Sequence, residues 1–157
     1  MGDIYEIESY EPRSGAGHLL GKVRVAMLAA LDREFAADPE LAKLEVTSAQ
    51  FAVLSWLCLY GARSASDLCR SISYDAGAMT RMVDRLESKG LVRRSRSADD
   101  RRLVHIELTD AGNTAFPPMR AVAVRVLNRF LRGFSKSEAR QLESFLTRML
   151  ENAHAEV

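Results

Sequence analysis

The sequence has few of the features that mark secreted, fibrous or membrane proteins. Its two cysteines, Cys58 and Cys69, are too few for a disulfide-stabilised fold and lack the paired spacing of a structural zinc site. Nine glycines and four prolines in 157 residues exclude collagen-like and low-complexity chains. The longest unbroken apolar run, Val25 to Leu31, is far shorter than the ~20 residues of a membrane span, and the acidic N-terminus has no apolar signal segment. We therefore expect a cytoplasmic protein that has reduced thiols and no membrane contact.

The chain also lacks an excess of charge of one sign. Its 22 Lys and Arg residues nearly balance 21 Asp and Glu residues, which excludes a histone-like protein and an acidic disordered tail. The distribution is nevertheless uneven. Residues 1–11 contain four acids and no base, whereas residues 81–102 contain eight bases and four acids. A local basic excess of this kind matters more for a polyanionic partner than the total charge.

Patterns that indicate catalysis or metal binding are absent from the sequence. The three histidines, His18, His105 and His154, have no second His or Cys at helical ligand spacing. The sequence contains no nucleophile elbow, phosphate-binding loop or dinucleotide fingerprint. We therefore expect no enzyme activity, no catalytic residue, no metal and no cofactor.

Apolar periodicity predicts six helices and one β-hairpin. Thr47, Ser64, Thr109 and Ser135 are the predicted N-cap residues, and Gln50 and Glu138 complete capping boxes with Thr47 and Ser135. The predicted helices cover about residues 18–36, 47–61, 64–72, 75–89, 109–133 and the segment after 135. Asp38-Pro39 should end the first helix, and Pro117-Pro118 should kink the fifth. The second helix is apolar on nearly all sides, so we expect it to be deeply buried, including Cys58. Residues 91–94 and 103–108 predict two strands that flank a charged loop.

The fourth predicted helix, over residues 75–89, has one apolar and one polar face. The polar face carries Gly77, Thr80, Arg81, Asp84, Arg85 and Ser88. A short helix and a tight turn precede it, and a basic hairpin follows it, which is the order of parts in a winged helix-turn-helix. In such a protein the second helix enters the major groove, where arginine bonds guanine, and wing arginines can enter the minor groove. The alternative is an ordinary amphipathic surface helix.

Two stretches resemble the MarR family of bacterial winged helix-turn-helix transcriptional regulators. They are DAGAMTRMVDRLESKGLVRR, residues 75–94, and ADDRRLVHIELTDAG, residues 98–112. The resemblance implies a mainly α fold with a small β-hairpin wing, in which interlocking N- and C-terminal helices form a homodimer. It also implies repression at a pseudo-palindromic double-stranded operator, relieved by a small aromatic or phenolic ligand. In the family's wing an Asp-x-Arg pair holds an inserting arginine. Here the pair falls on Asp100 and Arg102, with Arg101 as the alternative.

These interpretations give one domain, residues 1–157, and a set of candidate sites. Residues 14–38 and 109–155 should be dimerisation helices, and residues 45–108 a DNA-binding lobe that associates with the nucleoid when bound. The predicted DNA-binding residues are Ser73, Asp75, Gly77, Thr80, Arg81, Arg85, Arg96, Asp100, Arg101 and Arg102.

Three residues are candidates for the ligand pocket. Trp56 is either a core residue or the wall of an aromatic pocket, and His18 and Arg24 could bind a ligand carboxylate. Two alternative functions remain open. One is a winged-helix protein-interaction module whose basic face is only solvated. The other is a thiol-responsive regulator of the same fold, in which Cys58 or Cys69 acts as a switch instead of a small core residue.

Overall fold

The computed structural model describes residues 4–96 and 104–155. Residues 4–15 form turns, and a long helix and a single helical turn follow them. Helix α1 spans Ala16–Ala37 and helix α2 spans Pro39–Ala42. Asp38 ends α1 and caps α2, because its carboxylate accepts the amides of Glu40 and Leu41 at 3.1 and 3.2 Å. The predicted break is confirmed, whereas α2 is too short to produce a periodic pattern and was not predicted.

Helix α3 spans Ser48–Tyr60 and begins at the predicted capping box. The Gln50 amide donates to Thr47 Oγ1 at 3.3 Å, and the Thr47 amide donates to Gln50 Oε1 at 3.2 Å. The expectation of deep burial is wrong for the last turn, where Leu59 is 70% exposed and Cys58 and Tyr60 are also exposed. Cys58 is therefore not a core residue. The face is uncovered because no other element of the described protomer packs over this turn.

The next two helices form the predicted helix-turn-helix. Helix α4 spans Ala65–Ile72 and helix α5 spans Ala76–Ser88, joined by a turn in which Ser73 takes a left-handed conformation. Ser64 caps α4, and Leu68 at its centre is fully buried. Cys69, also on α4, is half-buried and packs against the core, as a small core residue would.

A small antiparallel sheet follows α5. Strands β2 (Val92–Arg96) and β3 (Val104–Leu108) form the predicted hairpin. A two-residue strand, β1 (Arg63–Ser64), pairs with the other edge of β3, so the strand order is β1-β3-β2. Two residues cannot show an alternating pattern, and β1 was not predicted. On β3, Ile106 is buried and Val104 is 45% exposed, and Leu103 at the predicted start of the strand lies outside the described residues.

Helix α6 (Asp110–Phe130) links the sheet to the terminal helix α7 (Lys136–Ala155). It begins at Thr109, whose hydroxyl accepts the Gly112 amide at 3.0 Å, as predicted. Helix α6 continues through Pro117 and Pro118 without a break, and the kink predicted at these prolines stays a prediction. Ser135 and Glu138 form the predicted capping box of α7.

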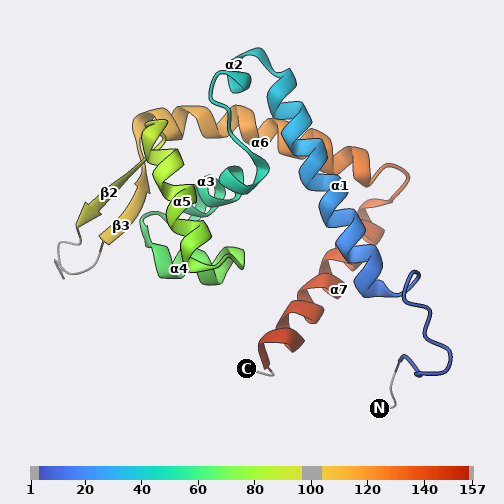
Figure 1. Ribbon diagram of the computed structural model, residues 1–157. Helices are drawn as coiled ribbons and strands as arrows, with labels where there is room; N and C mark the ends of the chain where they lie inside the picture. Colours follow the sequence, from blue (N-terminus) through green and yellow to red (C-terminus); the bar gives the residue numbers. More distant parts are fainter. Residues whose placement is uncertain (1–3, 97–103, 156–157) are drawn as a thin grey trace.

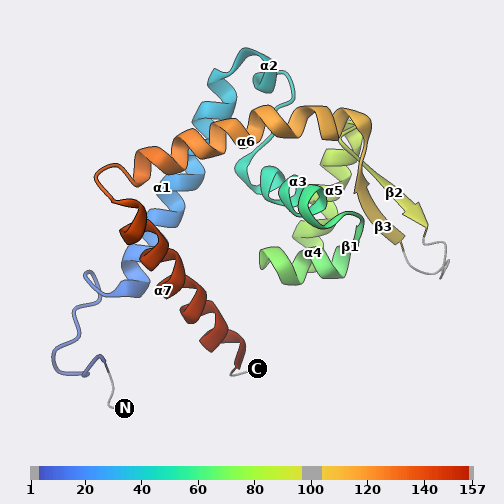
Figure 2. The same ribbon diagram turned by 180° about the vertical axis from the view of Figure 1, so that it is seen from behind.

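Figures 1 and 2 show two groups of elements joined by α6. Helices α3, α4 and α5 and the sheet gather at one end of α6, and α1 crosses its other half. The core joins the C-terminal half of α1 to α3, α5, the sheet and α6. Helix α7 leaves an apolar stripe uncovered, which comprises Leu142, Phe145, Met149 and Leu150. No helix in the described part of the chain is long and apolar enough to cross a membrane.

Candidate nucleic-acid interface

Helix α5 has the two faces that the sequence predicted. Met79, Val83 and Leu86 are at most 1% exposed and anchor the helix on the core. The predicted polar face is exposed at every position, namely Gly77, Thr80, Arg81, Asp84, Arg85 and Ser88. Burial of the apolar face therefore fixes which side chains α5 presents to a partner.

The N-terminal end of α5 is held by its own cap. Asp75 Oδ1 accepts the Ala78 amide at 2.8 Å, and the left-handed Ser73 ends α4 just before it. The Thr80 hydroxyl donates to the Ala76 carbonyl at 2.8 Å, which leaves its oxygen lone pairs and its methyl group for outside contacts. The geometry shows Ser73 and Asp75 setting the position of α5, a role that they perform without any partner.

Gly77 and Arg81 lie one turn apart at this end. A Cβ atom on Gly77 would lie 3.2 Å from Asp75 Oδ1 and 3.4 Å from Arg81 Nη1, so the guanidinium of Arg81 extends back beside Gly77. Within the described residues neither Arg81 nor Arg85 forms an ion pair. Their positive charges are open to a polyanion on the surface of α5.

Two other arginines of this region are already neutralised. Arg94 on β2 bonds Asp84 at 2.6 Å and also pairs with Glu87, and these hydrogen bonds raise the pKa of the Arg94 guanidinium. Arg93 bonds Glu107 across the hairpin at 2.8 Å. The basic excess over residues 81–102 therefore overstates the free charge. Arg94 instead ties the wing strand β2 to α5.

The wing contributes Arg96, which is exposed at the end of β2 opposite Val104. The predicted wing-tip residues Asp100, Arg101 and Arg102 lie outside the described residues, so the Asp-x-Arg arrangement stays a prediction.

A hollow of about 240 Å³ lies between α4 and α5, and Thr80 of the polar face of α5 lines it. Ser66, Cys69 and Arg70 of α4 line it. Arg70 also bonds Asp67 at 2.5 Å, and the pKa of Asp67 is lowered by hydrogen bonds from Ser64 and then from Arg70. The sequence analysis did not identify Ser66 or Arg70, because α4 is too short for its outer face to give a distinct pattern.

The three ligand candidates lie on two helices and do not share one cavity within the protomer. His18 lines a hollow of about 570 Å³ whose lining residues all belong to α1, and Arg24 is exposed on the same helix. Trp56 is half-buried on α3, and its ring is tilted by 31° against that of Tyr60 with the centroids 4.4 Å apart. The exposed Leu59 and Tyr60 beside it were not predicted, because apolar composition alone indicated burial.

The described part of the chain contains no cluster of three or more His, Cys, Asp or Glu side chains that could hold a metal ion.

Comparison with known proteins links this surface to DNA-binding regulators. The profile described as the MarR family matches residues 46–104. The HTH-type transcriptional repressor MdtR of Bacillus subtilis is 30% identical over 114 residues, which cover 73% of this chain and 74% of MdtR.

Solved structures of two regulators match almost the whole fold. One is BpsR of Bordetella bronchiseptica, from a structure that concerns the regulation of its DNA binding by 6-hydroxynicotinic acid. It has a TM-score of 0.77 and 25% identity, and the match covers 89% of this chain and 96% of BpsR. A mutant of MarR from E. coli complexed with operator DNA has a TM-score of 0.74 and 28% identity and covers 85% of this chain and 92% of that protein. The proteins that share this fold and sequence are transcriptional regulators rather than enzymes.

Proposed function

The chain belongs to the MarR family of transcriptional regulators, and we propose that it acts as a homodimeric repressor that binds a pseudo-palindromic DNA operator. The observation that carries this proposal is the polar face of α5, which exposes Thr80, Arg81 and Arg85 on a helix that packs against the wing strand β2. In this proposal the whole chain is one functional domain. Residues 45–108 contact DNA, and residues 14–38 and 109–155 form the dimer.

The proposed contacts divide between the two grooves of DNA. Arg81 and Arg85 of α5 bond base edges in the major groove, where bidentate contacts to guanine are the commonest specific contact of arginine. Thr80 contacts a phosphate or a thymine methyl group, and Gly77 leaves room for the DNA backbone at the start of the helix. Arg96, with Arg101 and Arg102 placed by Asp100, binds phosphates or enters the minor groove.

The proposed dimer covers apolar surface that one protomer leaves exposed. Leu19, Val23 and Val25 are between 48% and 65% exposed on α1, and α7 has its own apolar stripe. Large contiguous apolar surfaces usually mark an interface, and an obligate dimer of this kind buries over ~2,000 Å² in total. A C₂ dimer would place its two α5 helices about one DNA turn apart, roughly 34 Å.

A small aromatic acid is the proposed effector. The exposed Leu59 and the tilted ring pair of Trp56 and Tyr60 offer an apolar wall, while His18 and Arg24 of α1 supply positive groups for a carboxylate. The description of BpsR with 6-hydroxynicotinic acid supports this class of ligand.

Selection of duplexes from a random DNA pool tests the proposed function. We expect an enriched pseudo-palindrome whose affinity falls steeply with salt, by a log–log slope of roughly −0.9 for each phosphate neutralised. The absence of an enriched sequence, together with salt-independent binding, would instead favour the protein-interaction module.

The exposed Cys58 favours a second candidate, a thiol-responsive regulator. Peroxide converts an accessible thiolate to a sulfenic acid, which changes the charge and size of the side chain. In this case hydrogen peroxide should weaken operator binding by the wild type and by Cys69→Ser, but not by Cys58→Ser.

A further inference from the structure

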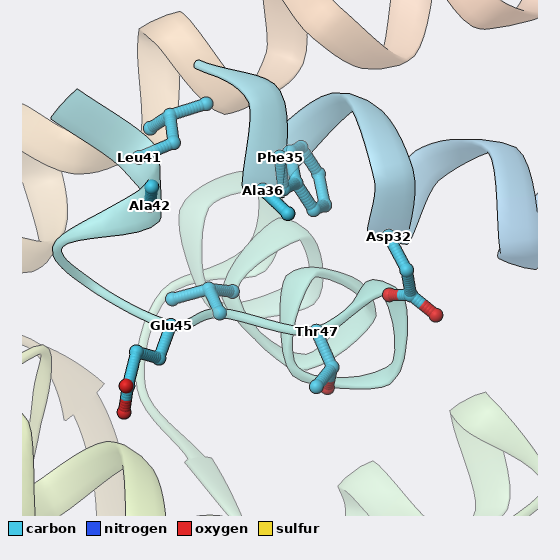
Figure 3. A pocket seen from close by; sticks show the side chains of 8 residues that line it. Asp32, Phe35, Ala36, Leu41, Ala42, Glu45 and Thr47 are labelled. Atoms are coloured by element: carbon cyan, nitrogen blue, oxygen red, sulfur yellow. The ribbon is translucent and has the colours of Figure 1, made fainter. Parts of the chain in front are cut away.

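A second cavity lies away from α5, between α1, α2 and the loop that leads into α3. Its volume is about 320 Å³, at the lower end of the range of small-molecule sites. Phe35, Leu41 and Val46 supply buried apolar side chains, and Ala36 and Ala42 leave space beside them. Figure 3 shows Phe35, Ala36, Leu41 and Ala42, with Asp32 and Glu45 on opposite sides of the site and their carboxylates directed outward from Phe35 and Leu41.

The charge of this cavity is opposite to that of the proposed aromatic-acid site. Its lining contains the carboxylates of Asp32 and Glu45 and no basic side chain, and the ammonium of Lys89 lies behind the wall on the Glu45 carbonyl. Asp32 accepts the Ser48 amide with Oδ1 at 2.6 Å, and its Oδ2 has no bonding partner in the part of the chain that is described. A cation with a small apolar body complements such a site, whereas a carboxylate would be repelled.

The cavity wall is bonded to the end of α5. Lys89 is the C-cap residue of α5. Its Nζ donates to the Glu45 carbonyl at 2.5 Å and lies 3.4 Å from Gln50 Oε1. Gln50 belongs to the capping box of α3, and Asp32 bonds the first amide of the same helix. One polar junction therefore joins α1, α3 and α5 along one side of the cavity.

The backbone of Glu45 is strained at this junction. Its φ angle is +47°, in the left-handed region that residues other than glycine rarely adopt. Such a conformation persists only when surrounding contacts hold it, and here the contacts are the Lys89 ammonium and the Ala42 carbonyl, which accepts the Glu45 amide at 3.1 Å. A ligand that pushes Glu45 outward would relax the loop and break the bond to Lys89.

We propose that this cavity is an effector site for small apolar amines, and that its occupation releases Lys89 and weakens DNA binding by α5. The inference rests on the proposed function for its effect on DNA but not for the binding of the amine. The apolar body lies between Phe35, Leu41 and Val46, and the ammonium bonds Asp32 at the mouth.

Calorimetry with the full-length protein tests the site, using 2-phenylethylamine, 2-phenylethanol and 3-phenylpropionate as probes that share a phenethyl body and differ in charge. The amine should bind, and the propionate should bind at least ten-fold more weakly. Ala36→Leu should fill the cavity and abolish binding, whereas Ala37→Leu, on the neighbouring exposed position, should not change it.

Asp32→Asn keeps an acceptor for Ser48 but removes the charge, so it should weaken amine binding about ten-fold. Glu40→Gln on α2 is the matched control.

A second measurement tests the coupling to α5, with the duplex enriched by selection. Saturating 2-phenylethylamine should weaken duplex binding at least five-fold in the wild type and in Lys89→Arg, but leave Lys89→Met unchanged. Thermal unfolding followed by circular dichroism confirms that each variant is folded. Lys89→Arg shows whether a positive charge and hydrogen-bond donors at position 89 are sufficient for the coupling.

The outcomes separate this inference from the proposed function. Equal binding of amine and propionate, no binding at millimolar amine, or equal binding by Ala36→Leu and Ala37→Leu would each overturn the site. Amine binding that leaves duplex affinity unchanged in the wild type would overturn the coupling. A protein that binds the amine but enriches no duplex keeps the site and refutes the DNA-binding proposal.

Discussion

Arginine residues near α5 differ in whether a neighbouring carboxylate has already taken up their charge. Arg93 and Arg94 bond Glu107, Asp84 and Glu87, whereas Arg81 and Arg85 form no ion pair within the described residues. A paired guanidinium must lose its partner before it can bind a phosphate or a base, which offsets most of the gain. The arginines that contact DNA should therefore be the unpaired ones.

Replacement of Arg81 by alanine should weaken operator binding by ~1–3 kcal/mol and relax the preference at one base pair. The reason is the loss of a bidentate contact to a base edge. Fluorescence anisotropy with the selected duplex and its single-base variants measures both effects. Arg93→Ala is the matched control and should stay within about two-fold of the wild type. A base-contacting role for Arg81 fails if Arg81→Ala binds all duplexes as the wild type does.

The pair between Arg93 and Glu107 should make stability depend on pH. The Arg93 guanidinium lowers the pKa of Glu107 below its usual 4.5. The stabilisation is therefore present above pH 4.5 and is lost as the pH falls through the lower folded value. Because the pair is largely exposed, we expect only about 0.5 kcal/mol.

Urea unfolding at pH 6 and pH 3 measures this contribution. Glu107→Gln should be less stable than the wild type at pH 6 and equal to it at pH 3. Arg93→Ala should show a similar loss, and the double variant should lose no more than either single variant. Additive losses would mean that the two side chains do not interact.

Sequence and structure agree best where a single residue type has one local role. The four predicted caps, Thr47, Ser64, Thr109 and Ser135, all bond the first turns of the helices that the sequence assigned to them. Ion pairs were not predictable in this way. Arg94 meets Asp84 only because the sheet folds back on α5, and one-dimensional spacing contains no information about that approach.

At the scale of the element, long helices were predictable from their periodicity and short elements were not. Helix α2 and strand β1 are four and two residues long, so neither gives a period. The burial predicted for the last turn of α3 was also wrong. An apolar surface can be covered by a second copy of the chain as well as by its own chain, and the sequence does not distinguish the two. For the same reason, the sequence did not show that the ligand candidates on α1, His18 and Arg24, lie apart from Trp56 on α3 within one chain.

The start of α6 shows why the motif LTDAG, residues 108–112, ends in glycine. A Cβ atom at Gly112 would lie 2.1 Å from the Leu91 carbonyl oxygen, far inside contact distance. The obstacle is backbone at the base of the wing, so no side chain can rotate away. Gly112 therefore allows α6 to pack directly on the strand that leads into the wing.

Gly112→Ala should destabilise the protein by more than ~3 kcal/mol, as overpacking against rigid backbone does. Thermal or urea unfolding measures the change. Asn113→Ala is the control in the same helical turn, since Asn113 is exposed and its loss should cost less than about 1 kcal/mol. A variant of Gly112 that unfolds like Asn113→Ala would show that α6 can move away from Leu91 at little cost.

On the scale of the whole molecule, the single chain leaves its terminal helices incompletely covered. Phe145 and Met149 are each 46% exposed on α7, although α7 is a continuous helix of 20 residues. Isolated helices gain most of their stability from packing of an apolar face. We therefore expect α7 to be stabilised by a second copy of the chain.

Phe145→Glu should convert the dimer to a monomer or raise its dissociation constant at least 100-fold, because it places a charge in an apolar interface. Sedimentation velocity at micromolar concentration measures the change. Thr147→Glu, on a different face of the same helix, should remain dimeric.

Deletion of residues 1–38 should give an insoluble protein or abolish DNA binding. A wild type that sediments as a folded monomer would refute the dimer and with it the palindromic operator.

The unbroken α6 has a mechanical consequence. It contacts α1 and α2 toward one end and β3 toward the other, and its 21 residues span about 31 Å at 1.5 Å per residue. A rod of that length converts a small rotation into a large displacement. A pivot of about 10° at the dimer end would move the wing end by roughly 5 Å, about one and a half base-pair steps of DNA. Two such levers in a symmetric dimer would change the spacing of the α5 pair without any change in the structure of either lobe.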